Sequence, residues 1–175
     1  VYIKDAFSIA GPVEKEGSIK DYDLVMDDYY YRAKTFEQAE IRMQRVVIDN
    51  LLRKNHLLHS DIDLLVSGDL SNQISVSCYA ASNYNIPFLG VYSACASFVE
   101  GLILASELIE TRKKANAVCV TSSHNLAAEK QFRFPIEYGA PKPSTTTFTA
   151  TGSVAVLLTK EKTDLRLESY TIGTV

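Results

Sequence analysis

Residues 87–97 read Pro-Phe-Leu-Gly-Val-Tyr-Ser-Ala-Cys-Ala-Ser, a short apolar run that turns directly into the start of a long helical pattern. The run predicts a buried strand over residues 87–92. Apolar side chains at three- and four-residue steps predict a helix over residues 97–112. Residues 116–122 form the next apolar run and predict a second buried strand. A strand, a helix and another buried strand in this order are typical of a parallel βαβ unit.

The same alternation continues on both sides of this unit. Thr35-Phe36-Glu37-Gln38 is a capping box that predicts a helix ending near Asn55. Further strands are predicted over residues 2–10, 63–68, 153–159 and 165–172, and a short helix over residues 75–84. We therefore predict an α/β fold with a mainly parallel five-stranded sheet and helices on both faces.

Two segments are predicted to lack regular structure. Residues 13–32 are charged and tyrosine-rich, and we expect a long loop whose tyrosines pack on a neighbouring element. Residues 126–149 are polar and contain three prolines, so we expect a loop with at most one turn of helix. A loop of this length is often functional.

Composition excludes several classes of protein. The 175 residues carry 18 Lys and Arg against 21 Asp and Glu, and this balance argues against nucleic acid as a partner. Three cysteines without a CxxC pair indicate a reducing compartment. Residues 70–99 carry no charge, but Asn, Gln and Pro interrupt them, so we expect a soluble chain. Because the chain lacks an initiator Met, we expect it to be a piece of a longer protein.

Cys95 is the first candidate for a functional residue, since it lies where the predicted strand at residues 87–92 becomes a helix. The free amides and the dipole of a helix start favour a thiolate and can bind an anion. The alternative is that Cys95 is a small core residue, as free cysteines often are. Cys78 and Cys119 fall within apolar patterns, and we expect both of them in the core.

His124 and Arg133 are the other two candidates. His124 ends the strand predicted over residues 116–122, and ligands of open parallel sheets gather at the carboxyl ends of strands. We therefore expect Cys95 and His124 to open onto one anion-binding hollow, where the pair could also support thiol chemistry. Arg133 lies between two phenylalanines, which suits a flat aromatic carboxylate. The alternatives are that His124 is only a hydrogen-bonded loop residue and that Arg133 lies in a solvated loop. The sequence predicts no cofactor and no metal site, and it lacks the glycine-rich phosphate-binding motifs.

Several blocks of this sequence are similar to those of a known family. The start of the helix at Ala94-Cys95-Ala96-Ser97 and the run at residues 151–158 are similar to the amino-terminal half of thiolase-fold proteins in general. A narrower similarity lies in residues 10–12, 68–73, 121–125, 128–135 and 137–139. Through these blocks the chain resembles the stage V sporulation protein AD family, a branch of the thiolase fold, and the whole resemblance covers residues 9–175.

The resemblance implies one thiolase-like amino-terminal domain over residues 1–175, half of a protein whose two similar halves pack together. It implies that the protein binds dipicolinic acid, with calcium, and belongs to the spore membrane complex that moves dipicolinate into the developing spore and releases it at germination. We then expect a cytoplasmic or forespore protein at the inner spore membrane, with other proteins of the complex as partners. The apolar surface left by the absent half favours a homo-oligomer.

The same resemblance places Cys95 at the position of the thiolase-fold nucleophile and His124 at the histidine of the family's Ser-Ser-His-Asn block. It implies a protein that binds and does not catalyse, because the second half of the fold supplies the catalytic histidine and its acid–base partner. Two alternatives remain open. One is an acyl-transferring thiolase or ketoacyl synthase with Cys95 as nucleophile, and the other is a scaffold with a vestigial pocket.

Overall fold

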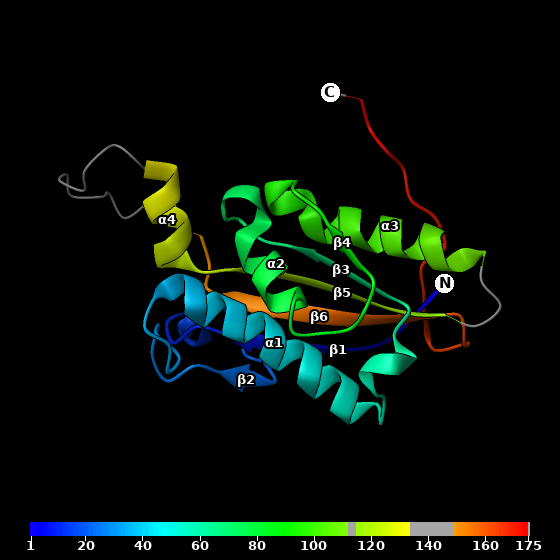
Figure 1. Ribbon diagram of the computed structural model, residues 1–175, viewed down its shortest axis with the longest axis horizontal. Helices are drawn as coiled ribbons and strands as arrows, with labels where there is room; N and C mark the ends of the chain where they lie inside the picture. The colour runs from blue at the N-terminus through cyan, green and yellow to red at the C-terminus, as the bar shows by residue number, and fades with distance from the viewer. Residues whose placement is uncertain (112–114, 134–148, 175) are drawn as a thin grey trace.

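The fold is built around a mixed sheet of seven strands (Figure 1). The computed structural model describes residues 1–111, 115–133 and 149–174, without the side chains of Phe132 and Arg133. The strand order of the sheet is β2-β1-β6-β5-β3-β4, with β7 paired to β1. The strands are β1 (Tyr2–Ala10), β2 (Leu24–Val25), β3 (Leu64–Gly68), β4 (Phe88–Gly90), β5 (Asn116–Ser123), β6 (Gly152–Thr159) and β7 (Leu165–Arg166).

The directions of the strands correct the prediction of a mainly parallel, five-stranded sheet. β3 runs parallel to both β4 and β5, as the βαβ pattern requires, but β6 is antiparallel to β5 and to β1. In Figure 1, α4 (Asn125–Arg133) lies beyond the end of the sheet and covers neither face. Without a helix crossing a face between β5 and β6, the chain returns in the opposite direction. β2 lies in the segment predicted to be a loop, and both β2 and β7 have only two residues each.

Helices cover both faces of the sheet, as predicted. α1 (Phe36–Lys54) and α2 (Ser75–Ala81) lie on one face, and α3 (Ser97–Glu110) lies on the other (Figure 1). Neighbouring residues of one strand pack against helices on opposite faces of the sheet, because successive side chains of a strand point to opposite faces. Leu65 packs with the α1 side of the core, whereas Val66 packs with Ala105 and Ile109 of α3.

The start of α1 follows the predicted capping box with one change of partner. Thr35 Oγ1 accepts a hydrogen bond from the backbone amide of Gln38 at 3.2 Å, as the motif requires. The Gln38 side chain accepts from the amide of Lys34 at 3.2 Å, one residue earlier than in the standard box. α1 ends at Lys54, within one residue of the predicted end.

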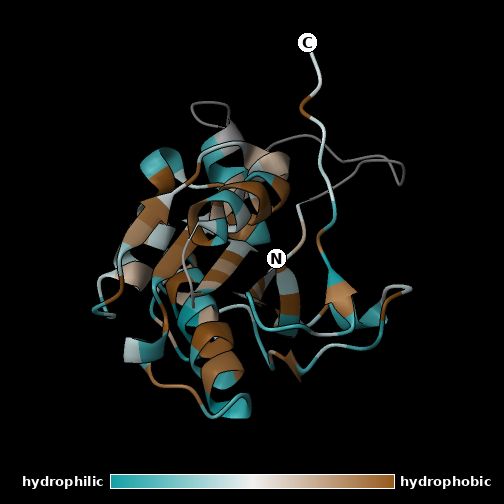
Figure 2. Cartoon of the chain, turned by 90° about the vertical axis from the view of Figure 1, so that its right-hand side faces the viewer, coloured by the Kyte–Doolittle hydropathy of each residue, from teal (hydrophilic) through white to brown (hydrophobic). Residues whose placement is uncertain are grey.

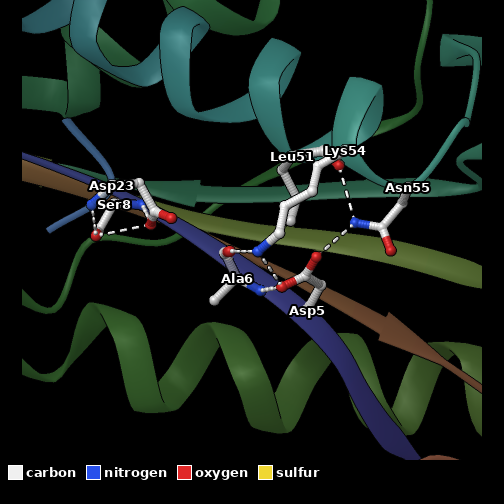
Figure 3. Close-up of polar contacts among 7 residues, drawn as sticks. All are labelled: Asp5, Ala6, Ser8, Asp23, Leu51, Lys54 and Asn55. Carbon is white, nitrogen blue, oxygen red and sulfur yellow. Dashed lines mark hydrogen bonds and ion pairs between the residues drawn. The ribbon is translucent and has the colours of Figure 1, made fainter. Parts of the chain in front are cut away.

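The carboxyl end of α1 is tied to β1 by a polar cluster around Asp5 (Figure 3). Lys54 Nζ lies 2.8 Å from Asp5 Oδ1, and Asn55 Nδ2 donates to Oδ2 at 3.0 Å. Burial alone would raise the pKa of Asp5, but the hydrogen bonds from Lys54, the Ala6 amide and Asn55 outweigh it and leave the pKa below its usual value. Asp5 is therefore an ionised anchor between the helix and the sheet.

The other differences from the sequence predictions are local. Residues 125–133 form the helix α4 where a loop with at most one turn was predicted, and the strand predicted over residues 165–172 is limited to β7. The remainder of the predicted loop, residues 134–148, lies outside the described residues. Figure 2 shows the hydrophobic strands enclosed between the helices and the C-terminal segment extending away from them. Within the described ranges, none of the helices has the length and apolar character needed to cross a bilayer.

Candidate functional site

A pocket of about 680 Å³ lies at the edge of the sheet where β1, β3 and β5 have their carboxyl ends. Ala10, Gly68 and Ser123 are the last residues of these three strands, and all of them line the pocket. Gly152 lines it as well, because antiparallel β6 begins at the same edge. Ligands gather at this edge in open α/β sheets, so the pocket is the leading candidate for a binding site.

Cys95 lies in a tight turn that forms one side of this pocket. The turn is a 3-10 helix, Ala94–Ala96, between β4 and α3, and the thiol is exposed. Ala94 adopts a φ of 46°, a left-handed conformation that costs an ordinary residue about 1–2 kcal/mol. Ser93 stabilises the turn from both of its polar groups, since its amide donates to Ser97 Oγ and its hydroxyl donates to the Glu100 carboxylate. The alternative that Cys95 is a core residue is therefore wrong.

The other two cysteines differ in burial. Cys119 is buried, as predicted, and burial raises the pKa of its thiol to about 12. Cys78 is exposed on α2, so the prediction that it belongs to the core is wrong. The buried residues of α2 are Val76, Ser77, Ala80 and Ala81, and Cys78 falls between them on the outer side of the helix.

Glycine at the end of β3 allows the start of α3 to approach the sheet closely. A Cβ at Gly68 would lie 2.9 Å from the carbonyl oxygen of Val91 and 2.9 Å from Ser97 Cβ. Both distances are shorter than real Cβ atoms tolerate. A side chain at this position would therefore push the turn that carries Cys95 away from the pocket.

The pocket walls are rich in hydroxyl groups and carboxylates. Ser8, Ser97, Thr121, Ser122, Ser123, Thr151 and Ser153 supply hydroxyls, and the charged side chains on the described walls are Glu14, Asp69 and Glu129. None of the wall residues that the structure describes is Lys, Arg or His. The described wall side chains therefore supply no positive charge for an anion, and the anion-binding character expected of the backbone amides at the start of α3 stays a prediction.

Two of the wall carboxylates are engaged with backbone amides. Asp69 accepts from the amide of Ser71 and from the amide of Ser77, both at 2.7 Å, and so holds the turn between β3 and α2. Glu14 Oε1 accepts from the amide of Thr151 at 2.7 Å, whereas its Oε2 is buried and has no hydrogen-bond partner among the described residues. Because this oxygen is enclosed next to Gly11, a ligand in the pocket can reach it only if the wall rearranges.

His124 is enclosed by aromatic side chains and does not line the pocket. Its side chain is fully buried, its ring stacks on Phe36 with the centroids 5.0 Å apart, and Tyr29 packs edge-on at 5.8 Å. Nε2 lies 2.8 Å from the carbonyl oxygen of Tyr29, so Nε2 must donate and Nδ1 carries the lone pair. The hollow that Cys95 and His124 were expected to share is therefore not formed by these two side chains.

The surroundings of His124 favour its neutral form. Burial lowers the pKa of His124, while the Tyr29 carbonyl and the charges of Glu37 and Glu14 act in the opposite direction. Nδ1 is buried and has no hydrogen-bond partner in the described part of the chain. A proton on this nitrogen would be a buried donor without an acceptor, which explains why burial dominates.

A buried polar network lies behind the pocket wall. Gln44 Nε2 donates to Ser122 Oγ at 2.8 Å and to Ser77 Oγ at 3.0 Å, and Gln44 Oε1 accepts from Ser67 Oγ at 3.1 Å. Ser122, which lines the pocket, donates in turn to Glu40 Oε1 at 2.7 Å. Burial raises the pKa of Glu40 to about 8, although the Ser122 hydrogen bond acts against that rise. Glu40 is therefore mostly protonated at neutral pH.

This network was not predicted from the sequence, although the sequence contains a signal for it. Glu40 and Gln44 are four residues apart in α1 and lie beside Ala39 and Met43, two buried apolar residues of the same helix. Two polar residues at helical spacing beside a buried stripe indicate a hydrogen-bonded pair in the core. Arg133 is the last residue of α4, four residues after Glu129, and its side chain lies outside the described part of the structure.

Comparison with known proteins identifies relatives along the full length of the chain. Residues 1–175 match the family described as Stage V sporulation protein AD. The chain is 39% identical over 176 residues to the Stage V sporulation protein AD of Bacillus subtilis (strain 168), and this alignment covers 100% of the chain and 52% of the relative. The chain thus spans about half the length of this curated relative.

Solved structures with a similar fold include two enzymes of low sequence identity to this chain. The 3-oxoacyl-[acyl-carrier-protein] synthase III from Aquifex aeolicus VF5 matches with a TM-score of 0.62 at 16% identity, covering 93% of this chain and 54% of that one. The acyltransferase ChlB3 matches with a TM-score of 0.61 at 13% identity, covering 92% and 51%. At these identities the similarity establishes a thiolase-like α/β fold, in agreement with the sequence prediction, and does not extend to activity.

Proposed function

This chain belongs to the stage V sporulation protein AD family, and from that premise we propose that it forms the dipicolinate-binding half of a sporulation protein. The observation that carries the proposal is the pocket of about 680 Å³ beside the exposed thiol of Cys95, at the edge of the sheet where ligands gather. A planar aromatic dicarboxylate is small enough for this volume. The hydroxyl groups of Ser97 and Thr151 on its walls accept from the amides of Ser93 and Asn125, so each can still donate its proton to a ligand.

The carboxylates on the described walls affect whether dipicolinate can bind as a free dianion or only together with a cation. Glu14, Asp69 and Glu129 would repel a free dianion, and no cationic side chain on the described walls offsets them. We propose that dipicolinate binds together with calcium, because a divalent cation can bridge the ligand carboxylates and a carboxylate of the wall such as that of Glu14. Arg133, which follows Glu129 by one turn of α4, is the second candidate for balancing the ligand charge.

The test measures dipicolinate binding to the full-length protein by calorimetry, with and without calcium. Cys95→Leu fills the pocket beside the thiol, and Cys78→Leu makes the same change at an exposed position outside the pocket. We expect Cys95→Leu to weaken binding at least about tenfold, which corresponds to about 1.4 kcal/mol, and Cys78→Leu to leave it unchanged. Equal affinity for the wild type and Cys95→Leu would show that dipicolinate binds elsewhere.

Acyl transfer is the second candidate function, and the exposed thiol in a pocket is the observation that favours it. The described walls offer no histidine as a general base, and His124 is enclosed away from them. Incubation of the full-length protein with an acyl-coenzyme A, followed by mass spectrometry, tests for a covalent adduct on Cys95. An adduct that turns over would support an enzyme, whereas its absence supports binding alone.

A scaffold with a vestigial pocket is the remaining alternative. It is tested by the calorimetry described above for dipicolinate, since a scaffold would bind no dipicolinate.

The location and the protein partners are part of the same proposal. We place the protein at the inner spore membrane, in contact with other proteins of the spore membrane complex. Exposed apolar side chains of α3, Val99 at 58% and Leu108 at 47%, support a protein contact on this side of the molecule. Self-association through this face remains a prediction, and sedimentation of the full-length protein tests it.

A further inference from the structure

A second concave site lies on the outer side of α1, away from the pocket of Cys95. It is a groove of about 340 Å³ that we call the arginine groove, and Arg32, Arg42, Arg45, Gln38 and Tyr79 line it. Arg32 belongs to the loop that precedes α1, the residues from Gln38 to Arg45 belong to α1, and Tyr79 belongs to α2. The groove shares no lining residue with the pocket of Cys95.

Neighbouring groups hold two of the three guanidinium groups in place. Arg45 Nη2 donates to the carbonyl oxygen of Tyr79 at 2.7 Å, which ties the side chain to α2. The Arg42 guanidinium carbon lies 5.3 Å from the centre of the Tyr31 ring, within the range of a cation–π contact. Side chains held by such contacts lose little further freedom on binding a ligand.

The loop that carries Arg32 is held in an unusual conformation. Tyr31 and Arg32 both have a positive φ, 45° and 60° respectively. Asp28 stabilises this bend, because its Oδ1 accepts from the amide of Tyr30 at 2.7 Å and from that of Tyr31 at 3.0 Å. Left-handed backbone at ordinary residues costs about 1–2 kcal/mol each, and such strain gathers at functional sites. The bend places Arg32 beside the arginines of α1.

The groove concentrates positive charge in a chain whose net charge is −3. Its described walls hold three guanidinium groups and no carboxylate, whereas the described walls of the pocket of Cys95 hold three carboxylates and no guanidinium group. Arg45 Nε is buried and has no hydrogen-bond partner within the described ranges. Three like charges repel one another, so an anion bound among them would relieve that repulsion.

We propose that the arginine groove binds a phosphate group. Guanidinium groups donate pairs of hydrogen bonds to phosphate oxygens in a fixed fork geometry, and three of them can surround a tetrahedral anion. Gln38 adds an amide donor and Tyr79 an aromatic wall. The phosphate could come from a soluble phosphate monoester or from a lipid headgroup, since both present the same chemistry to the groove. This inference does not depend on dipicolinate binding at Cys95.

The first experiment titrates the full-length protein with inorganic phosphate and measures affinity by calorimetry. Arg42→Gln and Arg32→Gln each remove one guanidinium from an exposed position, and Arg53→Gln removes one from the same helix outside the groove. We expect the two groove variants to weaken phosphate binding about tenfold each and Arg53→Gln to leave it unchanged. The nitrogen–proton resonance of Arg45 Nε should shift as phosphate is added. Failure of the wild type to bind, or an equal loss in Arg53→Gln, would overturn the proposal.

A second experiment distinguishes the two sources of phosphate. Flotation with phosphatidylcholine vesicles is compared with flotation with vesicles that also contain phosphatidic acid, for the wild type and Arg42→Gln. Binding to the acidic vesicles that Arg42→Gln loses assigns the groove to a headgroup, and binding of free phosphate alone assigns it to a soluble monoester. Binding of malonate but not of phosphate would show a carboxylate site and reject the proposed ligand class.

Discussion

The imidazole of His124 stacks on the ring of Phe36 with their centroids 5.0 Å apart, so it lies against the start of α1 and not in the pocket that Cys95 lines. Its Nε2 reaches the carbonyl oxygen of Tyr29 at 2.8 Å. One side chain thus joins the end of β5, the loop before α1 and the first residue of α1. Its direct role is to hold these three segments together beside the edge of the sheet.

Replacement of His124 should therefore affect stability before it affects binding. His124→Ala removes a fully buried ring and the hydrogen bond to Tyr29, and we expect the free energy of unfolding to fall by about 2–4 kcal/mol. Urea denaturation at pH 7.5 measures this loss. His59→Ala, at an exposed position, is the control and should change the free energy little.

The pH dependence of stability provides a separate test of the same residue. Burial lowers the pKa of His124 in the folded protein, so the unfolded chain binds this proton more readily. The contribution of neutral His124 is fully present above about pH 6.5 and is lost as the pH falls toward the lower folded-state pKa. His124→Gln should make the free energy of unfolding less dependent on pH over this window. An unchanged slope would mean that the imidazole is solvated.

Glu40 should show the opposite pH dependence. Its pKa is raised to about 8, so the stability linked to its protonated form is fully present below the usual pKa of 4.5 and is lost as the pH rises through about 8. Glu40→Gln keeps an acceptor for Ser122 and carries no charge. We expect this variant to be about 1–3 kcal/mol more stable than the wild type at pH 8, with a flatter pH profile.

The matched control for Glu40→Gln is Glu37→Gln, one turn earlier in α1. Glu37 has a lowered pKa, because backbone and side-chain hydrogen bonds near the helix start favour its charged form against burial. This substitution should destabilise the protein slightly at neutral pH, by about 0.5 kcal/mol. If Glu40→Gln lowered stability at pH 8, the carboxyl would be ionised and satisfied in the core.

The sequence predicted the layers of this fold better than the geometry of the candidate site. Periodicity located α1, α3 and β5 within two residues, because each has a regular buried face. It could not show that β6 is antiparallel, since an eight-residue apolar strand has the same pattern in either direction. The helix α4 was missed because its amphipathic pattern is short and polar residues surround it.

The position of Cys95 followed from the strand-to-helix turn, but the direction of the His124 side chain did not. Side chains at a strand end can turn to either face, and the choice depends on contacts that are distant in sequence. Here Phe36 and Tyr29 provide an aromatic cage on the α1 side. The prediction that the tyrosines before α1 pack on a neighbour is confirmed by Tyr29 on His124 and by Tyr30 on Phe36.

The Asp5 cluster should stabilise the fold only where Asp5 is ionised. Because its folded-state pKa lies below the usual 3.8, the contribution is present above that pH and is lost as the pH falls through the lower folded-state value. We expect Asp5→Asn to lower the free energy of unfolding by about 1 kcal/mol at pH 7 and by much less at pH 3. Lys54→Met should show the same trend, and an equal loss at both pH values would indicate a steric effect.

Thiol reactivity should separate the three cysteines. Cys95 and Cys78 are exposed, whereas Cys119 is buried with a pKa raised to about 12. Iodoacetamide at pH 8 should label Cys95 and Cys78 and leave Cys119 unmodified in the folded protein, as peptide mass spectrometry would show. Dipicolinate with calcium should slow labelling of Cys95 and not of Cys78, which serves as the internal control. Equal protection of both would indicate a change away from the pocket.

Gly101 of α3 allows the helix to pack directly over Cys119 of β5. A Cβ at Gly101 would lie 2.7 Å from Cys119 Sγ, closer than real Cβ contacts allow. Alanine favours a helix over glycine by about 1 kcal/mol. Displacing a rigid strand residue costs about 1–3 kcal/mol, so Gly101→Ala should destabilise the protein overall.

Cys119→Ala alone should also destabilise the protein, because it leaves a cavity. Together the two changes should compensate, since the new methyl group occupies the space of the lost sulfur. A double-mutant cycle by urea denaturation measures this coupling, and additive losses would mean that α3 moves away from the sheet to accept the methyl group.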